Sequence, residues 1–167
     1  MKLGLDLHGV ITHNPIFFSE LSKLFLRNNW EIHLITGSKI TEELKAVLHA
    51  YKIHCSAFFS ISDYCEKKGV AVKYDDKGNP WLDEDVWDRT KAEYCEREKI
   101  DFHIDDSEKY GEFFVTPYCM FKPTLARFCW FFKDICSGGF MYNSPDAVYK
   151  NIEDVIKKIE ALRLNKK

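Results

Sequence analysis

The chain has 167 residues, enough for one domain with a sizeable core, and its 46% apolar and 30% charged residues are ordinary for a globular protein. The formal net charge of −2 gives no electrostatic basis for binding nucleic acid or an anionic membrane. No apolar run approaches the roughly 20 residues that span a bilayer, and Asp6 and His8 interrupt any signal-peptide pattern. We therefore expect a cytoplasmic protein with no nucleic-acid or membrane partner.

The first half of the chain alternates between strand and helix patterns. The expected elements are a buried strand over 2–7 with a tight turn at Gly9, an amphipathic helix over 16–28, a strand over 31–36, a helix from its cap at Thr41 to about 51, and a strand within 53–61.

The second half begins with a less regular stretch over 63–82. The expected elements there and beyond are a β-hairpin at about 70–82, a helix over 85–98, a strand over 101–104, a short strand over 113–115, and helices over 123–135 and 145–164. Strands that alternate with helices predict an α/β fold, a Rossmann-like three-layer sandwich with a mostly parallel sheet. We expect a single domain over 1–167 whose cap is absent or limited to the hairpin.

The cysteines and most of the histidines show no ligand pattern. Six cysteines form no CxxC pair, so we expect free thiols and no structural zinc. Five histidines are interpreted as surface or structural residues: His13, His33, His49, His54 and His103. An aromatic run over 128–132 is interpreted as core packing of a helix, with a dimer interface as the alternative, so both a monomer and a homodimer remain open.

Ligands of open parallel sheets bind beyond the carboxyl ends of the strands, so polar residues at those ends are the first candidates for a site. The first strand runs into Asp6-Leu7-His8-Gly9, the second ends in Thr36-Gly37-Ser38, and the strand near residue 104 ends in Asp105-Asp106-Ser107. Lys91 belongs to the helix that precedes this last strand. These segments bring together three carboxylates, hydroxyl groups, a lysine and a histidine.

This set of side chains suits phosphoryl transfer. A carboxylate can attack phosphorus and form an aspartyl-phosphate, and Mg2+ prefers carboxylate, water and phosphate oxygens as ligands. A lysine and a hydroxyl can hold the other phosphoryl oxygens. Each residue also has a structural interpretation, because aspartates favour caps and turns and most lysines are solvated.

Four segments in this order resemble the motifs of the haloacid dehalogenase-like (HAD) phosphohydrolase superfamily. They are Asp6-Leu7-His8-Gly9-Val10, Leu34-Ile35-Thr36-Gly37-Ser38, Lys91, and Ile104-Asp105-Asp106-Ser107, and they bracket about the first 110 residues. The resemblance implies an aspartyl-phosphate on Asp6, phosphate binding by Thr36, Gly37 and Lys91, and Mg2+ as cofactor. Its metal ligands would be Asp6, Asp105, Asp106 and the main-chain carbonyl of His8.

His8 departs from the family pattern, in which a second aspartate acts as general acid and base at this position. Histidine titrates near neutrality and can carry out the same proton transfers. The leading hypothesis is therefore a Mg2+-dependent phosphatase that acts on a small phosphate monoester, with Asp6 and His8 as catalytic residues. The alternatives are a catalytically weak or inactive protein that binds a phosphorylated ligand or a protein partner, and a phosphotransferase.

The spacing of the motifs limits the size of a cap. About 30 residues separate Asp6 from Thr36, which leaves room for one helix and a turn. The longer interval between Thr36 and Lys91 accommodates only the small hairpin. A small lid predicts an open site, and several small-capped members of the family act on nucleotides, so a nucleotidase is one option.

Overall fold

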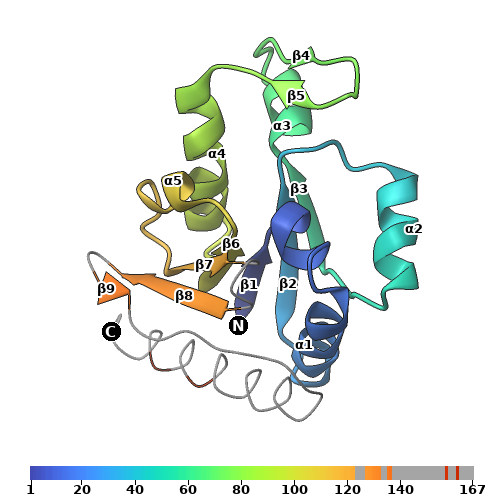
Figure 1. The fold of residues 1–167 in the computed structure, drawn as a ribbon, viewed down its shortest axis with the longest axis vertical. Coiled ribbons are helices and arrows are strands. Elements are labelled where there is room, and N and C mark those ends of the chain that lie inside the picture. The colour runs from blue at the N-terminus through green and yellow to red at the C-terminus, as the bar shows by residue number, and fades with distance from the viewer. Residues whose placement is uncertain (123–126, 133–134, 137–156, 158–160, 162–167) are drawn as a thin grey trace.

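The computed structural model describes residues 1–122, 127–132, 135–136, 157 and 161. It shows a three-layer α/β fold, in which one sheet lies between two layers of helices (Figure 1). The strand order is β3-β2-β1-β6-β7-β8-β9, and the first five of these strands are parallel. The two remaining strands add to the sheet in antiparallel orientation. The predicted fold class, Rossmann-like with a mostly parallel sheet, is confirmed.

The strand bounds agree closely with the predicted ones over the first 110 residues. The sheet contains β1 (Lys2–Leu5), β2 (Glu31–Thr36), β3 (Ala57–Ser60), β6 (Phe102–Asp105), β7 (Tyr118–Lys122), β8 (Arg127–Phe132) and β9 (Ile135–Cys136). The helical segments are η1 (Leu7–Ile11), α1 (Pro15–Arg27), α2 (Glu42–Ala50), α3 (Ile61–Lys67), α4 (Glu84–Arg97) and α5 (Glu108–Gly111). Among the described residues, no helix combines the length and the apolar character needed to cross a bilayer.

The helices begin where side chains can cap them. The carboxamide of Asn14 accepts a hydrogen bond from the Phe17 amide at the start of α1, and Pro15 takes the first helical position. Thr41 caps α2 in the same way, as predicted. The first turn of α3 is capped by Ser60, the last residue of β3, so this helix follows its strand without an intervening turn. Because no turn residue marks that boundary, the sequence did not indicate α3.

The two faces of the sheet pack against different helices. Alternate side chains of a strand point to opposite faces, and the larger apolar core takes its strand residues from one set of alternate positions, Leu3 and Leu5 in β1 and Ile32 and Leu34 in β2. α1 and α2 cover this face. A smaller core forms with α3 and α4 on the other face, where Ile35 is the β2 residue.

The strand predicted over 113–115 is wrong. Residues 113 and 114 continue the turns that end α5, since their amides bond to the carbonyls of Tyr110 and Gly111. Val115 is exposed, and the strand that pairs with β6 begins only at Tyr118. The apolar triplet was a misleading signal because Phe114 stacks on His103 rather than pairing in the sheet.

The helix predicted over 123–135 is also wrong. Residues 127–132 form β8, which pairs antiparallel with β7, and 135–136 form β9. Helical packing of Phe128, Trp130, Phe131 and Phe132 is therefore excluded. Aromatic residues favour strands, and a short apolar run does not by itself distinguish strand from helix. The helix predicted over 145–164 lies outside the described residues, apart from Lys157 and Ala161, which are helical.

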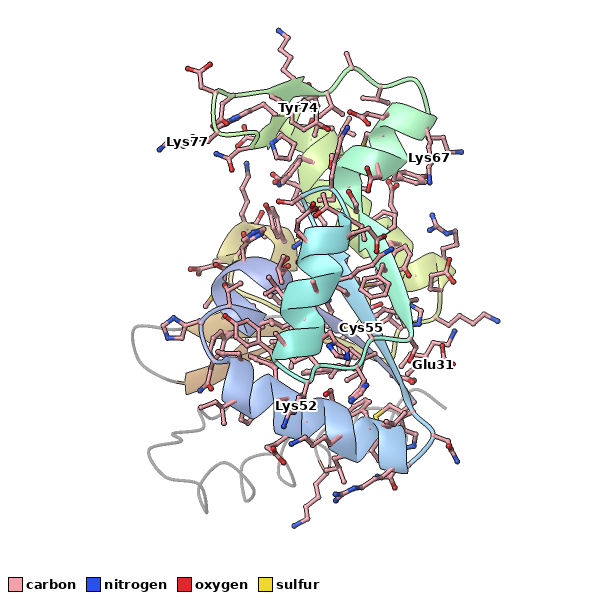
Figure 2. All side chains as sticks on the ribbon, turned by 90° about the vertical axis from the view of Figure 1, so that its right-hand side faces the viewer. Glu31, Lys52, Cys55, Lys67, Tyr74 and Lys77 are labelled. Atoms are coloured by element: carbon pink, nitrogen blue, oxygen red, sulfur yellow. The ribbon has the colours of Figure 1, made fainter. Side chains whose placement is uncertain are left out.

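The predicted hairpin is present, with shorter strands than expected. β4 (Lys73–Tyr74) and β5 (Pro80–Trp81) pair antiparallel and form a separate two-stranded sheet. Figure 2 shows Tyr74 of the hairpin at one end of the molecule, far from Glu31 at the start of β2. The hairpin therefore lies toward the carboxyl ends of the parallel strands, the end where the candidate site was predicted.

Candidate active site

The site lies where the direction of the strand order reverses. From β1 the sheet continues through β2 and β3 to one side and through β6 and β7 to the other, so β1 and β6 flank the switch point. Asp6 directly follows β1, and its amide donates to the carbonyl of Ile104 over 2.9 Å, which fixes Asp6 beside the end of β6. Asp105 is the last residue of β6. Open α/β sheets bind ligands at this position.

Lys91 of α4 joins the two aspartates. Its ammonium lies 2.7 Å from Oδ1 of Asp6 and 2.6 Å from Oδ2 of Asp105, and all three side chains are almost completely buried. The sequence predicted Lys91 only from its place before the Asp105 strand. The structure brings this lysine, among the 24 lysines and arginines of the chain, between the two predicted carboxylates.

Asp106 completes a group of three carboxylates. Oxygen atoms of Asp6, Asp105 and Asp106 all lie within 4.8 Å of one another, and Asp106 is the exposed member. The three carboxylates and the Lys91 ammonium sum to a charge of −2 when all are ionised, which matches a divalent cation. Oxygen donors of this kind fit Mg2+. Lys91 contacts one oxygen of Asp6 and one of Asp105, and the Ser107 amide donates to the other oxygen of Asp105. Each carboxylate oxygen has two lone pairs, so these contacts leave acceptor positions for a metal.

The burial of these groups shifts their pKa values in opposite directions. Burial raises the pKa of Asp6 to about 7; the Lys91 charge opposes this shift and the Asp105 charge adds to it. Burial would raise the pKa of Asp105 as well, but the Lys91 charge and a hydrogen bond from His103 hold it well below its usual range. Burial also raises the pKa of Asp106, with a contribution from Asp105. The cluster therefore has more negative charge than Lys91 alone can stabilise.

His103 belongs to the surroundings of the site, although it was not among the predicted site residues. It is fully buried, and its Nε2 lies 3.1 Å from Oδ2 of Asp105. Nδ1 has no hydrogen-bond partner and lies against Gly4, where a β-carbon would come within 2.5 Å of it. Since Asp105 accepts at Nε2, the proton is on that nitrogen. The signal available in the sequence was the alternation of β6, which places His103 and Asp105 on the same face.

His8 and Gly9 form the turn that follows β1. Gly9 has φ +74°, and a β-carbon there would overlap the carboxylate of Asp106. This close approach explains the glycine and places the turn against the metal-binding candidates. His8 is surface-exposed, and partial burial together with the Lys91 charge lowers its pKa. The structure therefore brings His8 to the same end of the sheet as Asp6.

Thr36 and Gly37 lie at the end of β2, the strand next to β1. Thr36 is fully buried, and its hydroxyl oxygen accepts a 3.3 Å hydrogen bond from the Ser38 amide. Gly37 has a steric reason to be glycine, because a β-carbon would overlap the indole of Trp87. The loop that contains both residues therefore contacts α4, the helix of Lys91.

The hairpin is attached to the loop that follows β2. Lys39 forms a 2.9 Å ion pair with Glu66 of α3, and the hydroxyl of Tyr74 donates to the same glutamate over 2.8 Å. The Lys39 ammonium also lies 4.9 Å from the centre of the Tyr74 ring. These contacts are exposed and weak individually. They nevertheless join the hairpin to α3 and to the loop that follows β2.

Two comparisons with known proteins leave the family of this chain open. The chain matches none of the protein-family models with which it was compared. No curated protein matches it significantly. The α/β fold with its five parallel strands stands on the structure, while the activity must be inferred from the chemistry of the site.

Proposed function

We propose that this protein is a Mg2+-dependent, HAD-like phosphatase that hydrolyses a small phosphate monoester through an aspartyl-phosphate on Asp6. The observation that supports it most is the buried Lys91 ammonium between Asp6 and Asp105, with Asp106 close by, at the switch point of the sheet. A buried cation held by two carboxylates contributes little to stability for its cost in desolvation. A function that needs a fixed positive charge beside a carboxylate explains this arrangement better.

Each residue has a defined task in the proposed reaction. The free oxygen of Asp6 attacks phosphorus, and the bond from phosphorus to the leaving oxygen breaks while His8 gives that oxygen a proton. Water then attacks the phosphorus of the aspartyl-phosphate and passes a proton to His8, and the bond between Asp6 and phosphorus breaks. Lys91 and the Thr36–Gly37 loop hold the phosphoryl oxygens throughout.

The cofactor would be held by carboxylate oxygens of Asp6, Asp105 and Asp106, the Asp6 oxygen being the one that does not attack phosphorus, with the main-chain carbonyl of His8 as a further predicted ligand. Bound Mg2+ would supply positive charge that offsets repulsion between the carboxylates and the phosphoryl group. Asp105 is prepared for this role because His103 and the Ser107 amide orient its carboxylate.

The test is phosphate release from a panel of nucleotides and sugar phosphates, measured with Mg2+ and with a chelator. Magnesium-dependent release that disappears in Asp6→Asn is the expected result, and the best substrate in the panel identifies the class of monoester. Asp85→Asn, at an exposed position in the first turn of α4, is the matched control and should retain activity. A folded protein that binds Mg2+ but releases no phosphate above the Asp6→Asn background would instead support a binding protein without turnover.

His8 can be tested separately. His8→Ala removes the proposed acid and base and should lower kcat by about 100-fold or more, the usual contribution of such a group. His13→Ala, at an exposed position after the same turn, is the control. If His8→Ala retains full kcat, the proton is transferred by another group and His8 has no catalytic role. A strong increase of kcat in His8→Asp would mean that the native site is poorly adapted to hydrolysis.

A further inference from the structure

Trp87 of α4 and Tyr110 of α5 form an aromatic bridge beside the site. The indole Nε1 of Trp87 donates a hydrogen bond to the hydroxyl oxygen of Tyr110. The Lys91 ammonium lies 5.1 Å from the centre of the Tyr110 ring, within the range of a cation–π interaction. α4 and α5 lie side by side in Figure 1, and both aromatic side chains are partly buried. Neither residue belongs to the four motifs of the sequence.

The same bridge contacts the loop that follows β2. The six-membered ring of Trp87 lies directly against the α-carbon of Gly37, where any side chain would overlap two of its carbons. Trp87 and Lys91 are four residues apart in α4 and therefore share one face of the helix. One indole thus contacts the predicted phosphate loop and shares a helix face with the lysine, and its hydrogen-bond partner covers the ammonium.

The metal-binding candidates are held by Lys91 and, in addition, by contacts that do not involve the bridge. Asp105 is oriented by His103 and by the Ser107 amide, and Asp6 is fixed by the hydrogen bond from its main-chain amide to the carbonyl of Ile104. The bridge takes part in none of these hydrogen bonds. Its removal should therefore disturb the groups that bind phosphate more than the carboxylates that bind metal.

We propose that the Trp87–Tyr110 bridge is a positioning element for phosphate, which holds Lys91 and the Thr36–Gly37 loop at the separation that lets both bind one phosphoryl group. This inference rests on the proposed function and adds two positioning residues to it. A lysine that is displaced by about 1 Å loses much of its value for a bound anion. An aromatic ring over the ammonium and an indole against the loop limit both movements.

The test compares two affinities in the same variants: inorganic phosphate in saturating Mg2+, and Mg2+ alone, both measured by calorimetry. Trp87→Leu and Tyr110→Leu should each weaken phosphate binding by roughly tenfold, as expected for residues that orient primary ligands, and change Mg2+ affinity less than twofold. Tyr110→Phe keeps the ring over Lys91 and should lose about threefold or less. A merely structural role would not separate the two affinities.

Two controls exclude nonspecific effects. Lys109→Gln removes a 2.8 Å ion pair to Asp88 that also connects α5 with α4, and it should leave phosphate affinity within twofold. Trp81→Leu, at a hairpin tryptophan that is 64% exposed, should do the same. If the leucine variants do not fold, as judged by circular dichroism, the milder double variant Trp87→Phe/Tyr110→Phe replaces them, with an expected loss of phosphate affinity between that of Tyr110→Phe and that of the leucine variants.

The possible outcomes separate this inference from the proposed function. Wild-type protein that binds phosphate, with folded bridge variants that bind it equally well, overturns the inference alone. Equal losses of Mg2+ and phosphate affinity, or the same loss in Lys109→Gln, also overturn it, because the effect would then be general loosening of the helices. Wild-type protein that binds no phosphate in Mg2+ overturns the proposed function and the inference together.

Discussion

The two faces of the sheet differ in polarity: one is apolar, and the other combines a smaller apolar core with buried polar and charged side chains. Toward α1 and α2 the strands present an apolar surface, against which four buried residues of α1 pack: Phe17, Phe18, Leu21 and Phe25. Toward α3 and α4 the alternate strand positions include a glycine, two histidines and the site aspartates: Gly4, Asp6, His33, His103 and Asp105. Two residues of α4 contact these polar groups. The Tyr94 hydroxyl lies 2.8 Å from Nδ1 of His33, and the buried Lys91 pairs with both aspartates.

This difference shows how a small domain can separate stability from chemistry. We call the side of the sheet covered by α1 and α2 the α1 face, and the side covered by α3 and α4 the α4 face. Burial of apolar area is the main favourable term in folding, and the α1 face supplies most of the large buried side chains. The α4 face gives up part of that gain to keep charges in place, at a cost in desolvation. We therefore expect substitutions on the α4 face to respond to Mg2+, and substitutions on the α1 face to be indifferent to it.

The largest expected effect is that of Lys91→Met. Two buried carboxylates would lose their cation, which typically costs roughly 3–5 kcal/mol. The free energy of unfolding, measured with urea, should fall by this amount without metal and recover in part with saturating Mg2+. Lys45→Met, which breaks an exposed pair with Glu42 in α2, should cost less than about 1 kcal/mol. A loss in Lys91→Met that Mg2+ does not reduce would contradict metal binding by these carboxylates.

Phe18→Ala should produce a similar loss on the opposite face. Phe18 is fully buried and makes edge-to-face contacts with Phe17 and Phe121, so its truncation should cost roughly 3–5 kcal/mol. The gain in Tm on adding Mg2+ should equal that of the wild type, because the proposed metal site is untouched. Leu26→Ala, in the same helix at a 57% exposed position, is the control. A changed response to Mg2+ would mean that the two faces are coupled.

The fold could be predicted wherever local signals and tertiary pairing agree. Alternating strands and capped helices predicted the order of elements up to β6 except for α3, and Thr41 marks the start of α2. Prediction failed beyond β6, where β8 is a strand that pairs antiparallel with β7. Residues 127–132 have no local feature that distinguishes a strand from a helix as clearly as that pairing does. Long-range pairing of this kind cannot be read from one segment alone.

The site could be predicted in part, because the carboxyl ends of parallel strands meet at one edge. From the sequence alone, this rule predicts that Asp6, Thr36 and Asp105 lie at the same end of the sheet. His103 was missed although it lies two residues from Asp105 in β6. Trp87 and Tyr110 were missed because their positions depend on contacts with Gly37 and Lys91 in other segments. A role that is defined by a distant partner leaves no spacing signature in the chain.

The pH dependence of stability in Asp6→Asn tests the buried charge on the α4 face. Burial raises the pKa of Asp6 to about 7 from an ordinary value of 3.8, so the folded state takes up a proton and this group loses stabilising effect as pH rises from about 4 to 7. Asparagine does not titrate. Without metal the variant should therefore be more stable than the wild type above pH 7, by up to about 4 kcal/mol, and the advantage should shrink toward pH 5. Urea unfolding at several pH values measures it.

Mg2+ provides the control for that experiment. It binds the ionised carboxylate, so saturating metal should stabilise the wild type and reduce or reverse the advantage of Asp6→Asn. Asp85→Asn should show no such pH dependence, because Asp85 is exposed at the start of α4. An Asp6→Asn variant that is less stable than the wild type at every pH would mean that the Lys91 pair outweighs the burial of Asp6.

The smallest expected effect concerns the hairpin, whose exposed contacts with Lys39 and Glu66 are weak. Tyr74→Phe removes the hydroxyl that donates to Glu66 and weakens the link to Lys39. An exposed contact of this kind is worth less than about 1 kcal/mol, so Tm should hardly change. Amide exchange over 73–81 should nevertheless accelerate, because the hairpin would lose an exposed link to α3. If exchange also accelerated at β1 and β6, the hairpin and the carboxylate cluster would form one cooperative unit. The hairpin would then belong with the residues of the α4 face.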